Sequence, residues 1–231
     1  MREGRLGPVN SEQEEYLQSA IDSCNEIVVM IDNLLDVQRF EAGKMPLSVR
    51  TFTASDIAAS AVQQFLRAAE HFNISLTLDA KSASAQIVVD RAAMGRVFAN
   101  LLVNAIKFTP EGGTIVVSTQ CVENSELHPI YMPEYVRNTD VINAQRCCVK
   151  FSVSDNGNGI PAEDLGRIFE RYTQSHNTTV REKGGAGLGL AFCKLAVESF
   201  NGVIWAESTL ESGSVFSILL PCSSSEDSGC P

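Results

Sequence analysis

Asn100-Leu-Leu-Val-Asn104-Ala-Ile-Lys107-Phe108-Thr-Pro110 is the stretch that decides the fold, and three later segments belong with it. In chain order they are Asp155-Asn-Gly157-Asn-Gly159-Ile160, then Phe169-Glu-Arg-Tyr172, then Gly184-Gly-Ala-Gly187-Leu-Gly189-Leu190. Each segment has an ordinary structural explanation when it is taken alone. The inference therefore depends on the chemistry of the set and on its order.

The first segment predicts a helix that Asp90 caps and that runs to about Lys107, before Pro110. Asn100, Asn104 and Lys107 are spaced i, i+4 and i+7, so they share one face. The buried side would carry Met94, Val97, Phe98, Leu101 and Leu102. Amide oxygens suit a cation and do not repel a triphosphate, and an ammonium attracts phosphate. The alternative is that both amides bond nearby backbone.

Asp155 follows a strand-like alternation of apolar residues, and two glycines come directly after it. An ionised carboxylate only accepts hydrogen bonds, so it favours the exocyclic amine of adenine over the oxygen of guanine. Gly157 and Gly159 would allow the backbone to approach a base, and Ile160 would pack on the purine. The alternative is a simple Asp-Asn-Gly turn.

Gly184–Leu190 is a glycine-rich loop that runs into a helix. Exposed N–H groups and a helix N-terminus favour anions, although the spacing is not that of a P-loop. The preceding residues, 173–183, are polar and predict a mobile lid over a nucleotide. Arg181 and Lys183 would close onto phosphates, unless they are ordinary solvated charges.

Together the four segments resemble the catalytic, ATP-binding domain of sensor histidine kinases over about residues 47–221. That domain belongs to the superfamily that includes gyrase-type and heat-shock chaperone ATPases and mismatch-repair proteins. Asn33-Leu-Leu-Asp36-Val-Gln-Arg39-Phe-Glu41-Ala-Gly43-Lys44 also resembles the end of the second helix of the kinase dimerisation hairpin. The resemblance implies an α/β fold: a two-layer sandwich of the Bergerat type with a mixed sheet, preceded by a long helix.

The resemblance also implies roles for individual residues, with ATP and Mg2+ as cofactors. Asn100, Asn104 and Lys107 would form the catalytic set, with Asn104 as the metal ligand and the other two near the phosphates. Asp155 would hold adenine with Gly157 and Gly159 beside it; Phe108 and Ile160 would line the base; Phe169 and Tyr172 would anchor the lid; Arg181 and Lys183 would lie in it; and Gly185, Gly187, Leu188, Gly189 and Leu190 would form the phosphate-side loop.

Phosphotransfer is favoured over hydrolysis because Asn100 stands where hydrolysing relatives carry a glutamate that activates water. His71, His128 and His176 all lack the context of a phosphoacceptor histidine, so we expect transfer to a hairpin outside this chain. Ala186 and Gln174 depart from the common family pattern and leave open a nucleotide-binding regulatory module with little turnover. A scaffold that docks partners through residues 11–42 and 121–147 is the third reading.

The organisation expected along the chain is a linker or tag over 1–10, the hairpin helix over 11–45, the ATP-binding domain over 46–221 and a disordered tail or linker over 222–231. Ser11–Glu14 fits a capping box. A heptad seam at positions 17, 21, 24, 28, 31 and 35 predicts a bundle or dimer contact more strongly than packing on the chain's own domain.

Downstream, the pattern predicts a helix to about Phe72, strands over 74–78, 87–89 and 114–119, and an antiparallel partner over 148–154. A helix over 188–200 and a hairpin around Glu211–Gly213 follow. Residues 121–147 are long for a hairpin connection and predict a surface excursion.

Composition excludes several classes. The chain has 231 residues, 44% of them hydrophobic, and a formal charge of 18 − 28 = −10, which argues against nucleic-acid binding. No apolar run reaches the roughly 20 residues of a membrane span, so we expect a cytoplasmic domain without membrane contact. Seven cysteines without CxxC spacing predict reduced thiols rather than a zinc site.

The resemblance implies a dimeric parent whose partners are an acceptor hairpin, of the same or a second chain, and a response-regulator receiver domain.

Overall fold

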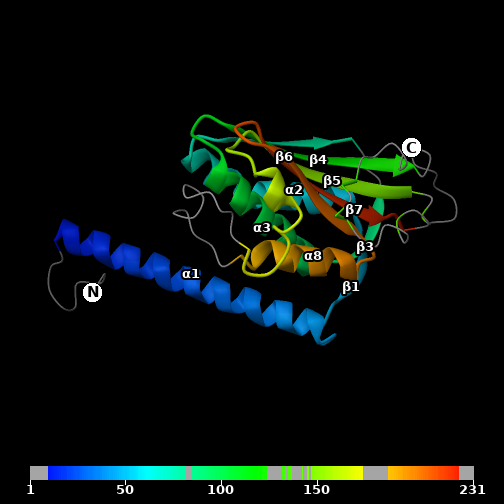
Figure 1. The fold of residues 1–231 in the computed structure, drawn as a ribbon, viewed down its shortest axis with the longest axis horizontal. Helices are drawn as coiled ribbons and strands as arrows, with labels where there is room; N and C mark the ends of the chain where they lie inside the picture. The colour runs from blue at the N-terminus through cyan, green and yellow to red at the C-terminus, as the bar shows by residue number, and fades with distance from the viewer. Residues whose placement is uncertain are drawn as a thin grey trace.

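The computed structural model describes residues 10–81, 85–123, 132–133, 135–136, 142, 145, 147–173 and 187–223, apart from six side chains between 22 and 30. These residues form a sheet covered by helices on one face, with a long helix that extends beyond the body (Figure 1). The predicted two-layer α/β architecture is confirmed.

The main sheet has five strands in the order β2-β4-β5-β7-β6. Their bounds are Ser75–Ala80 for β2, Thr114–Glu123 for β4, Cys147–Asp155 for β5, Gly213–Pro221 for β7 and Val203–Thr209 for β6. β2 and β4 are parallel and all other neighbours are antiparallel, so the sheet is mixed as expected. A separate antiparallel pair consists of β1 (Val49–Thr53) and β3 (Gln86–Asp90).

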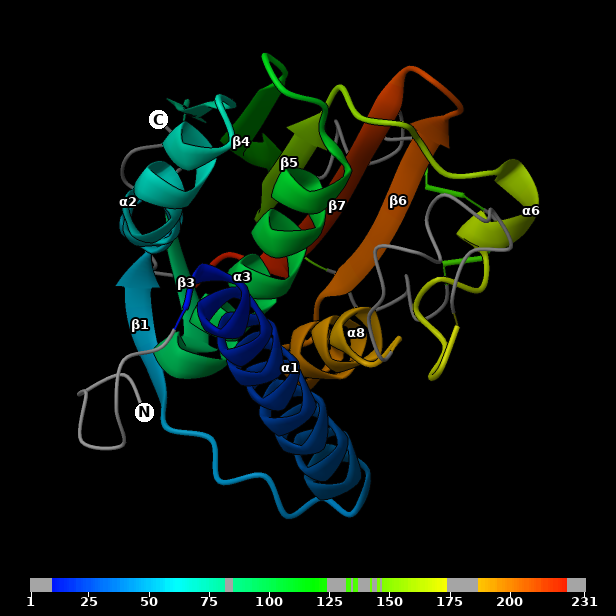
Figure 2. The same ribbon diagram turned by 90° about the vertical axis from the view of Figure 1, so that its left-hand side faces the viewer.

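Three helices lie together on one face of the sheet (Figure 2): α2 (Ala54–His71), α3 (Arg91–Phe108) and α8 (Gly189–Ser199). A short helix, α6 (Ala162–Leu165), follows β5. Strand alternation directs Phe151 and Val153 toward the helices, where the ring of Phe98 meets Phe151 edge to face at 5.5 Å. This apolar layer fixes α3 against the sheet. It therefore also determines which face of α3 points away from the sheet.

The long helix α1 (Ser11–Glu41) is confirmed, but its capping residue is Asn10 and not Ser11. The Asn10 side chain accepts from the N–H of Gln13, and the Gln13 side chain accepts from the N–H of Asn10. The capping box is therefore formed by Asn10 and Gln13, one residue before the expected Ser11–Glu14. Gly43 ends the helix at φ 62°, a conformation that glycine adopts without strain.

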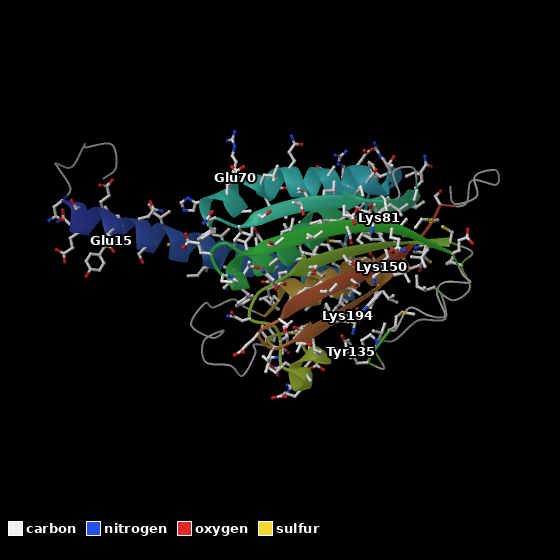
Figure 3. The ribbon with its side chains drawn as sticks, turned by 90° about the horizontal axis from the view of Figure 1, so that it is seen from above. Glu15, Glu70, Lys81, Tyr135, Lys150 and Lys194 are labelled. Carbon is white, nitrogen blue, oxygen red and sulfur yellow. The ribbon has the colours of Figure 1, made fainter. Side chains whose placement is uncertain are left out.

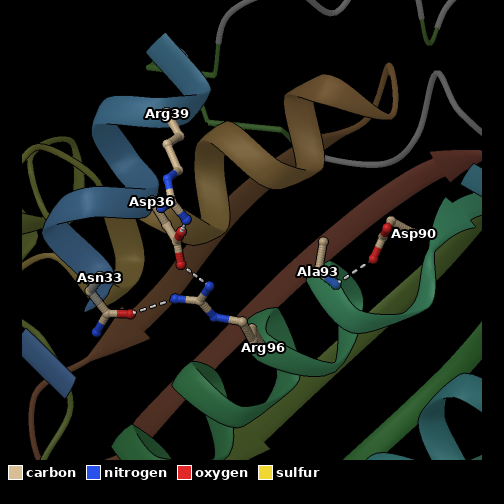
Figure 4. A network of polar contacts seen from close by, with 6 residues as sticks. All are labelled: Asn33, Asp36, Arg39, Asp90, Ala93 and Arg96. Atoms are coloured by element: carbon tan, nitrogen blue, oxygen red, sulfur yellow. Dashed lines mark hydrogen bonds and ion pairs between the residues drawn. The ribbon is translucent and has the colours of Figure 1, made fainter. Parts of the chain in front are cut away.

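The C-terminal part of α1 packs on the domain, and it uses a different stripe from the heptad seam. Val37 is fully buried, and the ring of Phe40 meets Phe192 of α8 edge to face at 5.6 Å. Arg96 of α3 donates to Asp36 and, at 3.1 Å, to Asn33 (Figure 4). Seam residues Ile21, Cys24, Val28, Ile31 and Leu35 are exposed.

Between β4 and β5, the described residues of the expected surface excursion at 121–147 are half-exposed except for one buried position. Ile142 is fully buried, and it packs with Trp205 and Leu219 in a second apolar cluster on the sheet face away from the helices. The Tyr135 hydroxyl donates to the carbonyl of Ala206 at 2.5 Å and accepts from its N–H at 3.1 Å. The Tyr135 side chain is labelled in Figure 3. These contacts tie the excursion to edge strand β6.

The cysteines are more varied than the sequence predicts. Cys148 and Cys193 are buried thiols, and burial raises the pKa of each to about 12. Cys24 is exposed on α1, whereas Cys121 is disulfide-bonded, contrary to the expectation of uniformly reduced, buried thiols. In the described part of the chain, no helix is long and apolar enough to cross a membrane.

Candidate functional site

The site is built on the polar face of α3. The Asp90 side chain accepts from the N–H of Ala93 at 2.8 Å, which fixes where the helix begins (Figure 4). The five apolar residues predicted for the buried side are all buried. Asn100, Asn104 and Lys107 are each half-buried on another face of the helix. The Asn100 side chain also forms a hydrogen bond with the Cys193 thiol of α8. The Lys107 ammonium also lies 5.6 Å from the ring centre of Phe108.

The glycine-rich segment meets this face of α3 at the start of α8. A Cβ on Gly189 would lie 2.8 Å from the side-chain oxygen of Asn100, so the start of α8 lies directly against this side chain and a larger residue would displace it. The buried Leu188 precedes Gly189, and its carbonyl accepts from Phe192 in the first turn. The N-terminus of α8, with its unsatisfied N–H groups, therefore opens beside Asn100.

Asp155 ends β5 and is almost buried, with 9% of its surface exposed. Its carboxylate accepts from the N–H of Gly157 at 2.9 Å and from the backbone of Ser214. Burial raises the pKa of the Asp155 carboxyl, and these two hydrogen bonds partly oppose the rise. A largely desolvated carboxylate at the end of a strand is well suited to accept from a donor on a planar heterocycle.

The turn after Asp155 docks on the end of α3. The N–H of Asn158 donates to the carbonyl of Phe108 at 3.3 Å. A Cβ on Gly157 would lie 2.5 Å from that same carbonyl oxygen and 2.8 Å from the Asp155 carboxylate. Glycine is therefore required for the turn to bring Asp155 next to Phe108.

Gly159 fixes the other side of the turn. Its φ is +72°, and a Cβ there would lie 2.1 Å from the carbonyl oxygen of Thr209. The next residue, Ile160, donates its N–H to the Ser208 hydroxyl at 2.8 Å and packs half-buried on the main core. Four of the predicted adenine-side residues thus lie in one turn between α3 and the β6–β7 hairpin, and the fifth, Phe108, ends α3 beside it.

Phe169 and Tyr172 flank the start of the predicted lid. Phe169 is buried and meets the ring of Phe216 edge to face at 6.4 Å. Tyr172 is exposed, but its N–H donates to the carbonyl of Gly187 at 3.0 Å, so the chain just before the predicted lid meets the glycine-rich loop that follows the lid. Arg171 forms an ion pair with Glu41 at the end of α1, which links this point to the long helix.

Several predicted site residues lie outside the described residues, namely Arg181, Lys183 and Gly185 together with the lid position Gln174 and the loop position Ala186. Leu190 is half-buried in the first turn of α8. Sequence reasoning missed Ser208 and Ser214, which hold Ile160 and Asp155. The register of β5 against β7, in which Asp155 pairs with Ser214, is the signal that identifies the second of them.

Comparison with known proteins decides the family. The model for histidine kinase-, DNA gyrase B- and HSP90-like ATPases matches residues 89–224, which include α3, the Asp155 turn and α8. This chain belongs to that ATPase family. Its sheet and helices are thus those of a histidine kinase-type ATPase domain, and its family fold is an ATP-binding one.

Several of the similar curated proteins are named as histidine kinases. The circadian input-output histidine kinase CikA of Synechococcus elongatus is 31% identical over 218 residues, which are 94% of this chain and 26% of that protein. The alginate biosynthesis sensor protein KinB of Pseudomonas aeruginosa is 30% identical over 221 residues, 96% of this chain and 33% of that protein. The ATPase domain and its helix therefore span about a quarter to a third of these relatives.

Solved structures show the same fold. Full-length ShkA in complex with AMPPNP has a TM-score of 0.71 at 21% identity, covering 94% of this chain and 40% of that one. The catalytic domain of histidine kinase ThkA has a TM-score of 0.57 at 23% identity, covering 76% of this chain and 98% of that one. At these identities the likeness concerns the fold.

Proposed function

We propose that this chain is the ATP-binding catalytic part of a sensor histidine kinase and transfers the γ-phosphoryl group of ATP to a histidine on an acceptor hairpin. The observation that carries the proposal is the meeting of Asn100 on α3 with Gly189 at the start of α8. It brings amide oxygens and the N–H groups of a helix N-terminus to one place, where phosphates and a cation can be held together.

Mg2+ fits the side chains of α3. Asn104 and Asn100 offer neutral oxygens one turn apart, and magnesium typically takes few protein ligands and completes its shell with phosphate oxygens and water. When bound, the ion offsets negative charge that develops on the phosphates. Asn104 would be its ligand, and Lys107 would place an ammonium beside the phosphate oxygens.

Asp155 would bind the adenine amine, while Phe108 and Ile160 would flank the base. In the transfer itself, the lone pair of one imidazole nitrogen would form an N–P bond as the bond from the γ-phosphorus to ADP breaks. ADP would leave with the electron pair of that bond, and the proton on the other imidazole nitrogen would pass to solvent. Because Asn100 cannot act as a general base, water beside the γ-phosphate is not activated by this position. Phosphate would therefore pass to the histidine in preference to water.

The partners follow from the same proposal. The acceptor hairpin would be supplied by the same or a second kinase chain, and the phosphohistidine would serve a receiver domain of a response regulator. The exposed seam of α1 supports a helical partner in a dimeric parent protein. Two of its apolar side chains, Val28 and Ile31, are 57% and 50% exposed.

A transfer assay tests the proposal. The chain is incubated with radiolabelled Mg-ATP and a separately made two-helix acceptor hairpin, and acid-labile, base-stable phosphate on the hairpin is measured. We expect labelling that Asn104→Ala abolishes and that the matched helix variant Gly95→Ala retains, because a Cβ on Gly95 meets no atom within 4 Å. Tight ATP binding without any transfer would instead support a regulatory nucleotide-binding module. No binding with or without magnesium would support a scaffold.

A further inference from the structure

Three of the seven cysteines converge at one end of the main sheet, far apart in sequence. Cys121 lies near the end of β4, Cys147 begins β5 and Cys222 directly follows β7. The Sγ atoms of Cys121 and Cys147 are 2.9 Å apart, and those of Cys147 and Cys222 are also 2.9 Å apart. All three sulfurs lie within 4.8 Å of one another.

The sheet register explains why the three side chains meet. Cys121 pairs with Val149, and because successive side chains alternate, Cys147 lies diagonally across on the same face. The N–H of Cys222 donates to the carbonyl of Cys147 at 3.1 Å, which sets these two residues opposite each other. Cys148 points to the other face, where it packs with Trp205, so it cannot join the group.

The cluster is separate from the nucleotide site. It occupies the opposite end of β5 from Asp155, which is about 27 Å away along the strand at about 3.4 Å per residue. It lies instead beside β3, because Cys222 bridges to Ile87 and the N–H of Ser223 donates to the carbonyl of Gln86 at 2.7 Å. None of the described residues that we assign to the nucleotide site lies at this end of the sheet.

We propose that Cys121, Cys147 and Cys222 form a binding site for a thiophilic metal ion of the zinc type, available when Cys121 is reduced. Zinc–sulfur bonds of about 2.3 Å in a tetrahedral arrangement place sulfurs roughly 3.8 Å apart. The present separations, 2.9 Å for two pairs and at most 4.8 Å for the third, bracket that value. Small side-chain rotations would therefore accommodate the ion, with water or a small thiol as fourth ligand.

The oxidation state of Cys121 controls this site. Cys121 is disulfide-bonded in the structure, so its sulfur cannot coordinate until that bond is opened. A dithiol reductant supplies the two electrons and becomes a cyclic disulfide itself. Zinc then displaces the thiol protons as the zinc–sulfur bonds form. The bound ion would join the ends of β4, β5 and β7 beside β3.

Zinc binding to the full chain tests the proposal. The reduced chain, freed of metal, is titrated with Zn2+ in competition with a chromophoric chelator, and Cd2+ is used to detect sulfur-to-metal charge-transfer absorption. We expect one equivalent per chain, a higher melting temperature and no binding by the oxidised chain. Each of Cys121→Ser, Cys147→Ser and Cys222→Ser should weaken binding at least about a hundredfold, since even outer-shell changes cost about 10- to 100-fold.

Matched controls keep the test decisive. Cys148→Ala changes the next residue on the same strand but the opposite face, and Cys24→Ser changes an exposed thiol on α1. Both should bind zinc as the parent chain does. Far-ultraviolet circular dichroism and binding of a fluorescent ATP analogue establish that the serine variants are folded. Absence of a stoichiometric site in the reduced chain, unchanged affinity in the three serine variants, or equal binding by the oxidised chain would overturn the proposal.

Discussion

Replacing Gly157 by alanine should weaken nucleotide binding by disturbing the contact between the Asp155 turn and α3. The new Cβ would lie 2.5 Å from the carbonyl oxygen of Phe108 and 2.8 Å from the Asp155 carboxylate. Ordinary contact begins at 3.4 Å, so the turn has to move by 3.4 − 2.5 = 0.9 Å. The carbonyl cannot simply withdraw, because it belongs to the last turn of α3 and accepts from Asn158.

Overpacking of this size costs about 1–3 kcal/mol. If the whole cost falls on binding, the dissociation constant for an ATP analogue rises roughly 5- to 150-fold, since about 1.4 kcal/mol is a factor of ten. If the nucleotide-free domain also cannot relieve the clash of the new Cβ, part of this cost appears as a lower free energy of unfolding of the variant. The two losses together should therefore come to about 1–3 kcal/mol.

Isothermal titration with a non-hydrolysable ATP analogue and Mg2+ measures the first quantity, and urea denaturation measures the second. Gly95→Ala is the matched control, because Gly95 lies in α3 with open space around it and alanine favours a helix interior by about 1 kcal/mol. Its nucleotide affinity should equal that of the parent chain. A Gly157→Ala variant with the parent's affinity and the parent's stability would refute the proposed role of the turn.

Other predictions concern the carboxylate, the docked helix and the excursion. Asp155→Asn should reduce the preference for ATP over GTP by about 10- to 150-fold, because a hydrogen bond to a charged group contributes about 1.5–3 kcal/mol. If titrations with both nucleotides give the variant and the parent chain the same ratio of ATP to GTP affinity, this prediction is wrong. Because the folded pKa of Asp155 is raised above 3.8, the native state binds more protons and this group's contribution to stability falls as pH rises through that window. Urea denaturation from pH 4 upward should therefore show the Asn variant gaining relative stability, and a pH-independent difference would count against it. Arg96→Ala removes the bonds to Asp36 and Asn33, so amide exchange in the C-terminal part of α1 should accelerate; unchanged protection there would mean that apolar packing alone holds the helix. Tyr135→Phe loses both bonds to Ala206 and should cost about 1–3 kcal/mol of unfolding free energy, whereas no loss would remove the excursion's anchoring role.

Local sequence patterns predicted most of the elements because their causes are local. Asp90 caps α3 as its position before the helix indicates, and the alternation of Val149, Phe151 and Val153 predicts a strand with one buried face. The cap of α1 was misplaced by one residue because Asn10 and Ser11 are both good caps, and a sequence pattern does not show which of them adopts the extended backbone.

The burial of Ile142 within the excursion was not predictable in the same way. Ile142 and Tyr135 lie in a stretch whose composition resembles a surface loop, and their partners Leu219 and Ala206 come from strands more than sixty residues later in the chain. Nothing within a short window reveals such pairing, because it depends on which strand forms the sheet edge. The same holds for the contact stripe of α1, whose apolar seam remains exposed while Val37 and Phe40 make the contact.

The sequence by itself was enough to indicate the family, because its four segments resemble, in residue types and in order, those of sensor histidine kinases. It also determined that Asn100, Asn104 and Lys107 share a face, since helical periodicity alone requires this. Only the tertiary structure decided that Asn100 meets the start of α8, that Gly157 lies against Phe108 and that Cys121, Cys147 and Cys222 converge. Each of those meetings depends on strand order and register, which are set by the packing of the whole core and not by neighbouring residues.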